Sequence, residues 1–399
     1  MPIDSDDFLR YSAKWNCRIQ LNLQLAVQIG LTSSDSVGGG LLTVRSIDSR
    51  LLRRIPVNTA LLEYPVPGLP DPGKWLQVAE GVYWIRMPLP FALDHINLWL
   101  LRDGAGWTVV DTGFGSAATK GLWEEIIANH LDGRPITRVI VTHLHPDHLG
   151  LAAWLAERFD VQIWMTQTEF LMAHTIWGGQ GGDMLARLAT LYRRHGLPED
   201  KVAMVAGRSG SYRLGVPSLP QSFCRLIGGD AVTIDGQTWH VLIGHGHSPE
   251  HAALYCESLR ILISGDMVLP KITTNVSVGA FEPDGNPLQM FLDSLTRFGA
   301  LPEDTLVLPS HGSVFYGLRQ RLKQLQEHHA ERFDIVLGAC NEPRAAPELL
   351  RYLFKREFDA HQLSFAMGET IAHLNFLMHS KKLQRLDEAD RYRFVRAAA

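Results

Sequence analysis

Short apolar runs, each followed by a turn signal or a helix-like stretch, dominate the middle of the chain. An Asp-Gly pair at 103–104 separates two of these runs and is a strong hairpin signal. Further on, apolar runs alternate with stretches of helical periodicity. Because alternating strands and helices are typical of α/β folds, the pattern predicts an α/β domain. The strands predicted in this half lie at 82–86, 97–102, 107–110, 138–141 and 161–164.

A second strand-rich half begins near residue 231. The Asp-Gly pair at 235–236 again marks a hairpin between two apolar runs. A helix-like stretch follows at 288–298, and from about residue 318 the pattern predicts helices to the end of the chain. The strands predicted in this half lie at 231–234, 239–243, 253–256, 260–263 and 305–308.

These patterns divide the chain into segments. Residues 1–70 are predicted to be an N-terminal arm of undetermined structure that ends in a proline-rich linker. Residues 71–325 form the α/β domain, and residues 326–399 form a small helical domain. Within the α/β domain, residues 166–228 are predicted to be a mostly helical insertion with a glycine-rich segment at 178–182. This insertion is either a lid over a site or a peripheral excursion that packs on the core.

One loop of the first half carries unusual chemistry. The string THLHPDHLG at 142–150 follows an apolar, β-branched run and precedes a helix-like stretch. Histidine makes up 17 of 399 residues, so an H-x-H-x-D-H string is expected by chance on the order of once per several hundred such chains. Loops at the carboxyl ends of strands are where α/β sheets build their sites. We interpret the string as a metal site, and imidazole with carboxylate favours zinc over iron or manganese.

Three further polar residues also terminate strand-like runs. His247 lies in GHGHSPEH at 244–251, Asp266 ends the run ILISG, and His311 ends LVLPS. Because the carboxyl ends of parallel strands converge on one edge of a sheet, four separate loops could supply a single site.

The order of these motifs resembles that of the metallo-β-lactamase-fold hydrolase superfamily. The matching elements are DTG at 111–113, THLHPDH, GHSPEH, SGD and PSHG, and together they span about residues 75–320. The resemblance implies a four-layer αββα sandwich of two mixed sheets, classed as α/β or α+β. By the same pattern, seven residues hold two divalent ions. These ligands are His143, His145 and His247 for one ion, Asp147, His148 and His311 for the other, and Asp266 as the bridge between them.

The implied chemistry is hydrolysis by a hydroxide that bridges two metal ions. Two divalent ions lower the pKa of a bridging water and stabilise the oxyanion that forms on the substrate. No serine or cysteine nucleophile is needed. Asp147 and Asp266 are therefore the expected catalytic residues, with Asp147 also orienting the hydroxide.

Other polar residues near the motifs have two interpretations each. Asp111 is expected to fix the tautomer of a ligand histidine or, alternatively, to cap the turn that follows it. His251 is expected to support the ligands or to be a buried structural residue. The candidates for substrate contact are His95, Lys271 and Tyr316, each with a solvated or packing role as the alternative.

Composition limits the partners, the cellular compartment and the substrate that we expect. The net charge of −4 argues against a general nucleic-acid or membrane-surface partner, and no apolar run approaches the length of a membrane span. The four cysteines are scattered, which argues against a disulfide framework and favours a reducing cytoplasm. The aromatic residues at 166–228 favour a small-molecule substrate with an apolar acyl or aromatic part.

The C-terminal stretch 369–377 resembles the winged-helix appendage of some family members. Ile371, Leu374 and Leu377 fall at three-residue steps, which predicts a buried helix face. Acidic residues dilute the basic ones here, so we expect a packing or homodimerisation element rather than a DNA-binding one.

Fold does not fix function, and three hypotheses stay open. The ligand set resembles glyoxalase II and the lactonases, which implies hydrolysis of a thioester, lactone or ester. Asp266 stands where true β-lactamases carry Cys or Ser, so β-lactam cleavage is expected only as a promiscuous activity. The alternatives are a metal-dependent endoribonuclease or phosphodiesterase, which would need a basic path to the metals, and a binding module that has lost catalysis.

Overall fold

The computed structural model describes residues 62–179, 184–207, 211–355 and 357–398. Most of the predicted N-terminal arm and residues 180–182 of the glycine-rich segment therefore lie outside the described residues.

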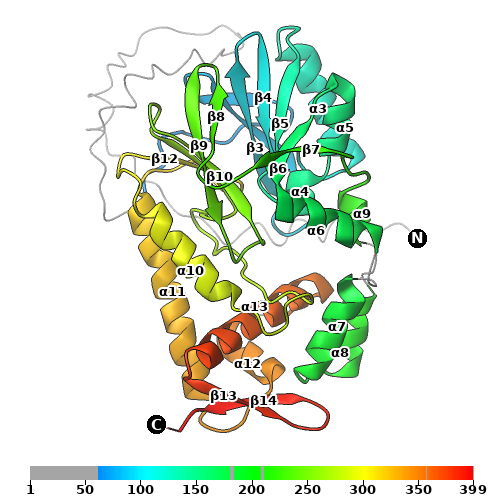
Figure 1. The fold of residues 1–399 in the computed structure, drawn as a ribbon, viewed down its shortest axis with the longest axis vertical. Helices are drawn as coiled ribbons and strands as arrows, with labels where there is room; N and C mark the ends of the chain where they lie inside the picture. Colours follow the sequence, from blue (N-terminus) through cyan, green and yellow to red (C-terminus); the bar gives the residue numbers. More distant parts are fainter. Residues whose placement is uncertain (1–61, 180–183, 208–210, 356, 399) are drawn as a thin grey trace, which may run out of the picture. The chain divides into compact units, whose positions relative to one another are not determined.

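The helices and strands follow one another along the chain and are labelled in Figure 1. In the first half they are β1 (Trp75–Ala79), β2 (Val82–Pro88), β3 (His95–Asp103), β4 (Gly106–Val110), α3 (Ala117–Asn129), β5 (Ile136–Ile140), α4 (Pro146–Leu149), α5 (Ala152–Phe159), β6 (Ile163–Thr166), α6 (Gln167–Gly178), α7 (Met184–Arg194), α8 (Glu199–Ala206), α9 (Ser211–Gly215) and β7 (Phe223–Leu226). In the second half they are β8 (Ala231–Ile234), β9 (Gln237–Gly244), β10 (His251–Cys256), β11 (Ile261–Gly265), α10 (Pro287–Phe298), β12 (Leu306–Pro309), α11 (Leu318–Ala339), α12 (Ala346–Leu353), α13 (Ala360–His379), β13 (Leu383–Asp387) and β14 (Tyr392–Arg396).

Two mixed sheets form the centre of the fold. The first has the order β1-β2-β3-β4-β5-β6-β7, antiparallel up to β4 and parallel from β4 onward. The second has the order β12-β11-β10-β9-β8, in which only β11 and β12 are parallel. Both predicted Asp-Gly hairpins are present, since β3 pairs with β4 and β8 with β9.

The inner faces of the two sheets share one apolar core. Trp84 and Trp99 are paired across β2 and β3, and both pack in the same cluster as Trp239 of β9. Their neighbours along β2, Tyr83 and Ile85, point to the opposite face and belong to a different cluster. This alternation follows from the two-residue period of a strand, which gives each sheet an inner and an outer apolar face.

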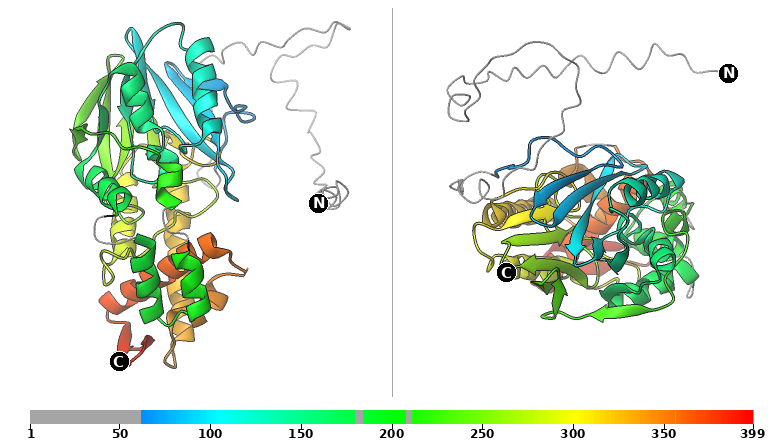
Figure 2. Two further views of the ribbon diagram at one scale, coloured as in Figure 1. Left: turned by 90° about the vertical axis from the view of Figure 1, so that its right-hand side faces the viewer. Right: turned by 90° about the horizontal axis from the view of Figure 1, so that it is seen from above.

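Helices cover both outer faces. Trp123 of α3 and Leu155 of α5 pack on the first sheet, while Phe291 of α10 and Leu322 of α11 pack on the second. The result is the αββα sandwich seen in Figures 1 and 2, which confirms the predicted fold class.

The predicted insertion at 166–228 is divided between two places. Side chains of α6 and α9 pack with the first sheet's outer cluster, and β7 forms the edge strand of that sheet. By contrast, Leu191 and Tyr192 of α7 and Val202 of α8 pack in one cluster with α13.

The C-terminal region differs from the sequence expectation at both ends. Helix α11 runs across the predicted boundary at 325–326. The prediction of helices to the end of the chain was wrong, because β13 and β14 form an antiparallel hairpin. Between these elements α13 buries Ile371, Leu374 and Leu377. No helix among the described residues is long and apolar enough to cross a membrane.

Candidate metal centre

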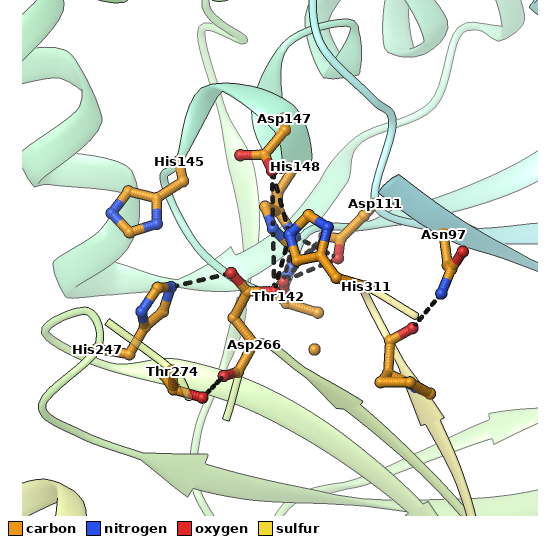
Figure 3. Close-up of polar contacts among 12 residues, drawn as sticks. Asn97, Asp111, Thr142, His145, Asp147, His148, His247, Asp266, Thr274 and His311 are labelled. Atoms are coloured by element: carbon orange, nitrogen blue, oxygen red, sulfur yellow. Dashed lines mark hydrogen bonds and ion pairs between the residues drawn. The ribbon is translucent and has the colours of Figure 1, made fainter. Parts of the chain in front are cut away.

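Loops at the ends of strands bring all seven predicted ligand residues together. All of them except His143 are labelled in Figure 3. His143 and His145 follow β5, and helix α4 after them carries Asp147 and His148. The remaining three each follow a strand of the second sheet. These are His247 after β9, Asp266 after β11 and His311 after β12.

Three histidines and Asp266 form the first ligand group. His143 Nε2 lies 2.8 Å from His145 Nδ1 and 3.2 Å from His247 Nε2. Asp266 Oδ2 is 3.3 Å from His247 Nε2. Four potential donor atoms therefore face one point, a number and mixture that a divalent transition metal accepts.

Asp147, His148 and His311 form the second group. His311 Nε2 lies 3.5 Å from Asp147 Oδ2, and His148 Nε2 lies 3.8 Å from the same oxygen. Asp266 reaches this group with its other oxygen, since Oδ1 is 3.5 Å from His311 Nε2 and 3.6 Å from His148 Nε2. One carboxylate thus presents one oxygen to each group.

Two buried atoms at this point lack any hydrogen-bond partner in the described part of the chain. They are His148 Nε2 and Asp266 Oδ1, which face each other at 3.6 Å. Buried polar atoms are normally satisfied, and a bound cation would satisfy both this imidazole nitrogen and this carboxylate oxygen. The donor set and these two atoms fit divalent metal ions.

The charges of the centre depend on the three aspartates. Burial lowers the pKa of His311, but Asp266 and Asp147 more than offset this and raise it to about 10. Burial likewise lowers the pKa of His148, yet Asp111 and Asp147 raise it well above the usual value. Burial raises the pKa of Asp147, and His148 and His311 reverse the effect and lower it to about 2. Protons and metal ions therefore compete for the same imidazole nitrogens.

Hydrogen bonds donated by Nδ1 orient three of the candidate ligand rings. His148 Nδ1 donates to Asp111 Oδ2 at 2.8 Å, and Thr142 donates its hydroxyl and backbone N–H to the same carboxylate. His311 Nδ1 donates to the backbone oxygen of His95, and His247 Nδ1 donates to that of Asn275, both at 2.8 Å. Each bond leaves Nε2 as the free acceptor that a metal requires. The structure thus gives Asp111 the first of its two expected roles.

Asp111 itself has φ 61°, in the left-handed region. Aspartate is one of the few residues other than glycine that visit this region readily. The buried carboxylate is thereby turned toward Thr142 and His148.

A buried glutamate that the sequence analysis did not single out joins two of the ligand loops. Glu169, on α6, accepts hydrogen bonds from Leu144 N at 3.0 Å and from Ser248 Oγ and Glu250 N at 2.6 Å. Leu144 lies between two ligands and Ser248 follows a third. Tyr212 of α9 also donates to the backbone oxygen of Leu144, at 2.7 Å. Residues of the insertion therefore hold two of the candidate ligand loops by hydrogen bonds.

Helix α11 fixes the loop after Asp266. The buried Arg321 donates to the backbone oxygens of Leu269 and Ile272 at 2.6 and 2.7 Å. In the same loop Thr274 Oγ1 donates to the backbone oxygen of Asp266 at 2.6 Å. Neither residue had a local sequence signal, because their partners are backbone atoms.

The remaining candidates lie in different surroundings. His251 is buried and its Nε2 accepts from the backbone N–H of Asp266 at 3.2 Å, so it holds the backbone of that residue. His95 borders the centre, where its Nε2 accepts from Gly312 N. Lys271 instead lies over the Tyr64 ring, with Nζ 5.9 Å from the centroid. Tyr316 pairs through its backbone with Glu63.

For two of the proposed substrate contacts the structure gives no support. Neither Lys271 nor Tyr316 has a hydrogen bond or ion pair with the ligand residues in the described structure. Burial raises the pKa of the Tyr316 hydroxyl, and Glu63 and Asp304 add to the effect. Asp304 precedes β12 whereas His311 follows it, so Tyr316 lies toward the opposite end of that strand. Contact of either residue with a substrate stays a prediction.

The fold and the histidine–aspartate centre together define a metallohydrolase of the αββα class. Residues 92–311 match the family model of the metallo-β-lactamase superfamily, and residues 333–397 match that of the metallo-β-lactamase-like C-terminal domain. The chain belongs to this superfamily, and the resemblance seen in the sequence is confirmed.

Individual proteins of known sequence or structure are also similar to this chain. The chain is 47% identical to a β-lactamase domain protein from Burkholderia ambifaria, whose crystal structure matches with a TM-score of 0.77 over 84% of this chain and 97% of that one. It is 26% identical over 312 residues to a probable metallo-hydrolase, YqjP, of Bacillus subtilis, covering 75% of this chain and 92% of that protein. It is 22% identical over 282 residues to an atrochrysone carboxyl ACP thioesterase of Aspergillus fumigatus, covering 67% of this chain and 71% of that protein.

Proposed function

We propose that the protein hydrolyses an acyl bond, in a thioester, ester or lactone of a small molecule, with two divalent metal ions, of which zinc fits best and iron or manganese next. The observation that carries this proposal is the position of Asp266. Its Oδ2 faces the first ligand group and its Oδ1 faces the second, as a carboxylate shared by two ions requires. The likeness to a thioesterase supports the acyl class.

Metal ions held by these residues supply Lewis acidity, which lowers the pKa of a water molecule and polarises the substrate carbonyl. The protein side chains provide the rest. Asp147 is the more accessible of the two aspartates, with 20% of its side chain exposed against 10% for Asp266. We therefore assign Asp147 the role of orienting the attacking water.

Several groups in and beside the site are buried. His143, His148 and His251 are fully buried, and the carboxylate of Asp111 lies behind them. Groups that are fixed before the reaction stabilise developing charge better than solvent does, because they need no reorganisation.

An activity panel on protein with a measured metal content tests this proposal. The panel contains thioesters, lactones, esters, β-lactams, phosphodiesters and RNA, each assayed with wild-type protein and the Asp266→Ala variant. We expect the highest kcat/KM on an acyl substrate and its loss in the variant. A higher kcat/KM on RNA or a phosphodiester, or activity that survives the substitution, would contradict the proposal.

A further inference from the structure

Aromatic rings from three separate segments meet beside the metal centre. Phe91 lies in the loop between β2 and β3, and its ring centroid is 5.6 Å from that of Phe114, in the loop after β4. On its other side Phe91 is 5.1 Å from His361, at the start of α13. His361 is in turn 4.7 Å from Phe365, one helical turn later. We call these four residues the aromatic rim.

Two phenylalanines of the rim are exposed to solvent. Phe91 is 41% exposed and Phe365 is 43% exposed. Scattered apolar residues on a surface need no explanation, but adjacent exposed rings from distant segments mark a binding site. The rings meet at tilted and edge-to-face angles of 44° to 88°, which leaves both faces and edges available to an apolar group.

Two segments of the rim also hold metal ligands in place. The loop that carries Phe91 leads into His95, whose backbone oxygen accepts the hydrogen bond from His311. Phe114 follows Asp111, the partner of His148, by three residues. The Phe114 ring packs closely on Gly215, whose other neighbour is Pro146 of the histidine motif. The rim therefore begins directly beside the ligand loops.

The third segment is anchored to the remaining ligand loop. The backbone oxygen of Gly368 on α13 accepts a hydrogen bond from Val278 N at 3.2 Å. Val278 lies three residues after Asn275, whose backbone oxygen accepts the hydrogen bond from His247 Nδ1. Tyr192 of α7 fixes α13 from another side, because its hydroxyl donates to the backbone oxygen of Ser364 at 2.7 Å. The start of α13 is thus held in a defined place opposite the loops of the sandwich.

We propose that the aromatic rim binds the apolar acyl group of the substrate. This inference rests on the proposed acyl hydrolysis, since it assumes a carbonyl that reacts at the metal centre. An acyl chain attached to that carbonyl must leave the polar centre, and the rim is the apolar surface that adjoins the ligand loops. It draws residues from both the sandwich and the C-terminal region, so acyl selectivity depends on both.

Substitution of the exposed rings tests the rim. We would measure kcat/KM for 4-nitrophenyl esters from acetate to decanoate with wild type, Phe91→Ala and Phe365→Ala, each with its metal content determined. The loss in each variant is expected to grow with acyl length, from about twofold for acetate to at least roughly tenfold for the longest chains. The matched control is Tyr352→Ala, an equally exposed aromatic residue on α12 that is expected to keep the wild-type profile. An equal loss at every chain length, or no loss, would overturn the assignment.

A binding measurement separates failure of the rim from failure of the proposed function. If the wild type hydrolyses none of the acyl substrates, the proposed function fails and the esters are uninformative. Calorimetric titration of metal-loaded protein with acetate and 4-phenylbutyrate then decides the matter. The rim predicts that 4-phenylbutyrate binds more tightly than acetate and that Phe91→Ala removes most of this gain. Equal affinity for the two acids would refute the rim.

Discussion

The molecule contains two groups of buried histidines, which differ in the residues that surround them. The metal centre surrounds its imidazoles with Asp111, Asp147 and Asp266. In the C-terminal region His329 of α11 and His373 of α13 face each other with 3.3 Å between Nδ1 and Nε2. No carboxylate forms an ion pair with either of these two rings in the described structure, and their neighbours include Phe291 and Phe333.

The electrostatics of the two groups diverge accordingly. Burial, together with the nearby His373 and His328, lowers the pKa of His329 to about 2. Burial also lowers the pKa of His373, to about 4, although its Nδ1 donates to the backbone oxygen of Glu369. In the metal centre the carboxylates reverse the effect of burial on His148 and His311. Buried histidines alone thus stay neutral, whereas histidines with aspartates create a site for positive charge.

Removing Asp266, the carboxylate that we propose to be shared, should make the candidate metal centre behave more like the His329–His373 pair. In Asp266→Ala we expect bound metal to fall and kcat/KM to drop by more than the roughly 100-fold that losing an outer hydrogen-bond partner of a metal ligand costs. Metal analysis and steady-state kinetics on the same sample measure both quantities. The control is Asp304→Ala, which removes an exposed aspartate. Full activity with wild-type metal content in Asp266→Ala would end the assignment of Asp266 as the bridge.

Weakening one supporting carboxylate should have a smaller effect. In Asp111→Asn we expect a metal affinity about 10- to 100-fold lower, because the amide no longer favours the His148 tautomer whose Nε2 is free. Competition with a fluorescent chelator gives the affinity. Asp160→Asn is the matched control, since Asp160 also has a left-handed backbone, φ 54°, but lies exposed at the end of α5. Equal affinities in the two variants would show that the hydrogen bond to His148 does not matter.

The neutral pair, His329 and His373, should make the free energy of unfolding depend on pH. The unfolded state binds a proton on His373 below pH about 6.5, whereas the folded state does so only near pH 4, so the free energy of unfolding falls as the pH falls between these values. At pH 5 this loss amounts to about 2 kcal/mol. Urea unfolding at pH 8, 6.5 and 5 should show a shallower pH dependence in His373→Asn than in wild type. Identical dependences would contradict the low pKa.

The sequence predicted the candidate ligand residues because the loops that carry them follow apolar runs. The runs before His143, Asp266 and His311 became β5, β11 and β12, and strand ends place their next residues at one edge of a sheet. Adjacency in the sequence does not place Tyr316 beside His311, because the chain turns after His311 and runs back along β12, where Phe315 pairs with Val307.

The supporting residues could not be found in the same way. Glu169, Tyr212 and Arg321 act through backbone groups far away in the sequence, and no local pattern records such a partner. The C-terminal hairpin was missed because β13 alternates only weakly, with one buried residue, Leu383, among half-buried and exposed ones.

The central claim is that the histidines beside aspartates bind metal ions and the His329–His373 pair does not. Counting the metal ions bound per chain tests it most directly. Inductively coupled plasma mass spectrometry on wild type, Asp266→Ala and His329→Asn, each saturated with zinc and then dialysed, gives the number of ions per chain. The shared-carboxylate centre predicts two ions per chain in wild type and in His329→Asn, and fewer in Asp266→Ala. One ion or none in the wild type, or loss of an ion on replacing His329, would contradict it.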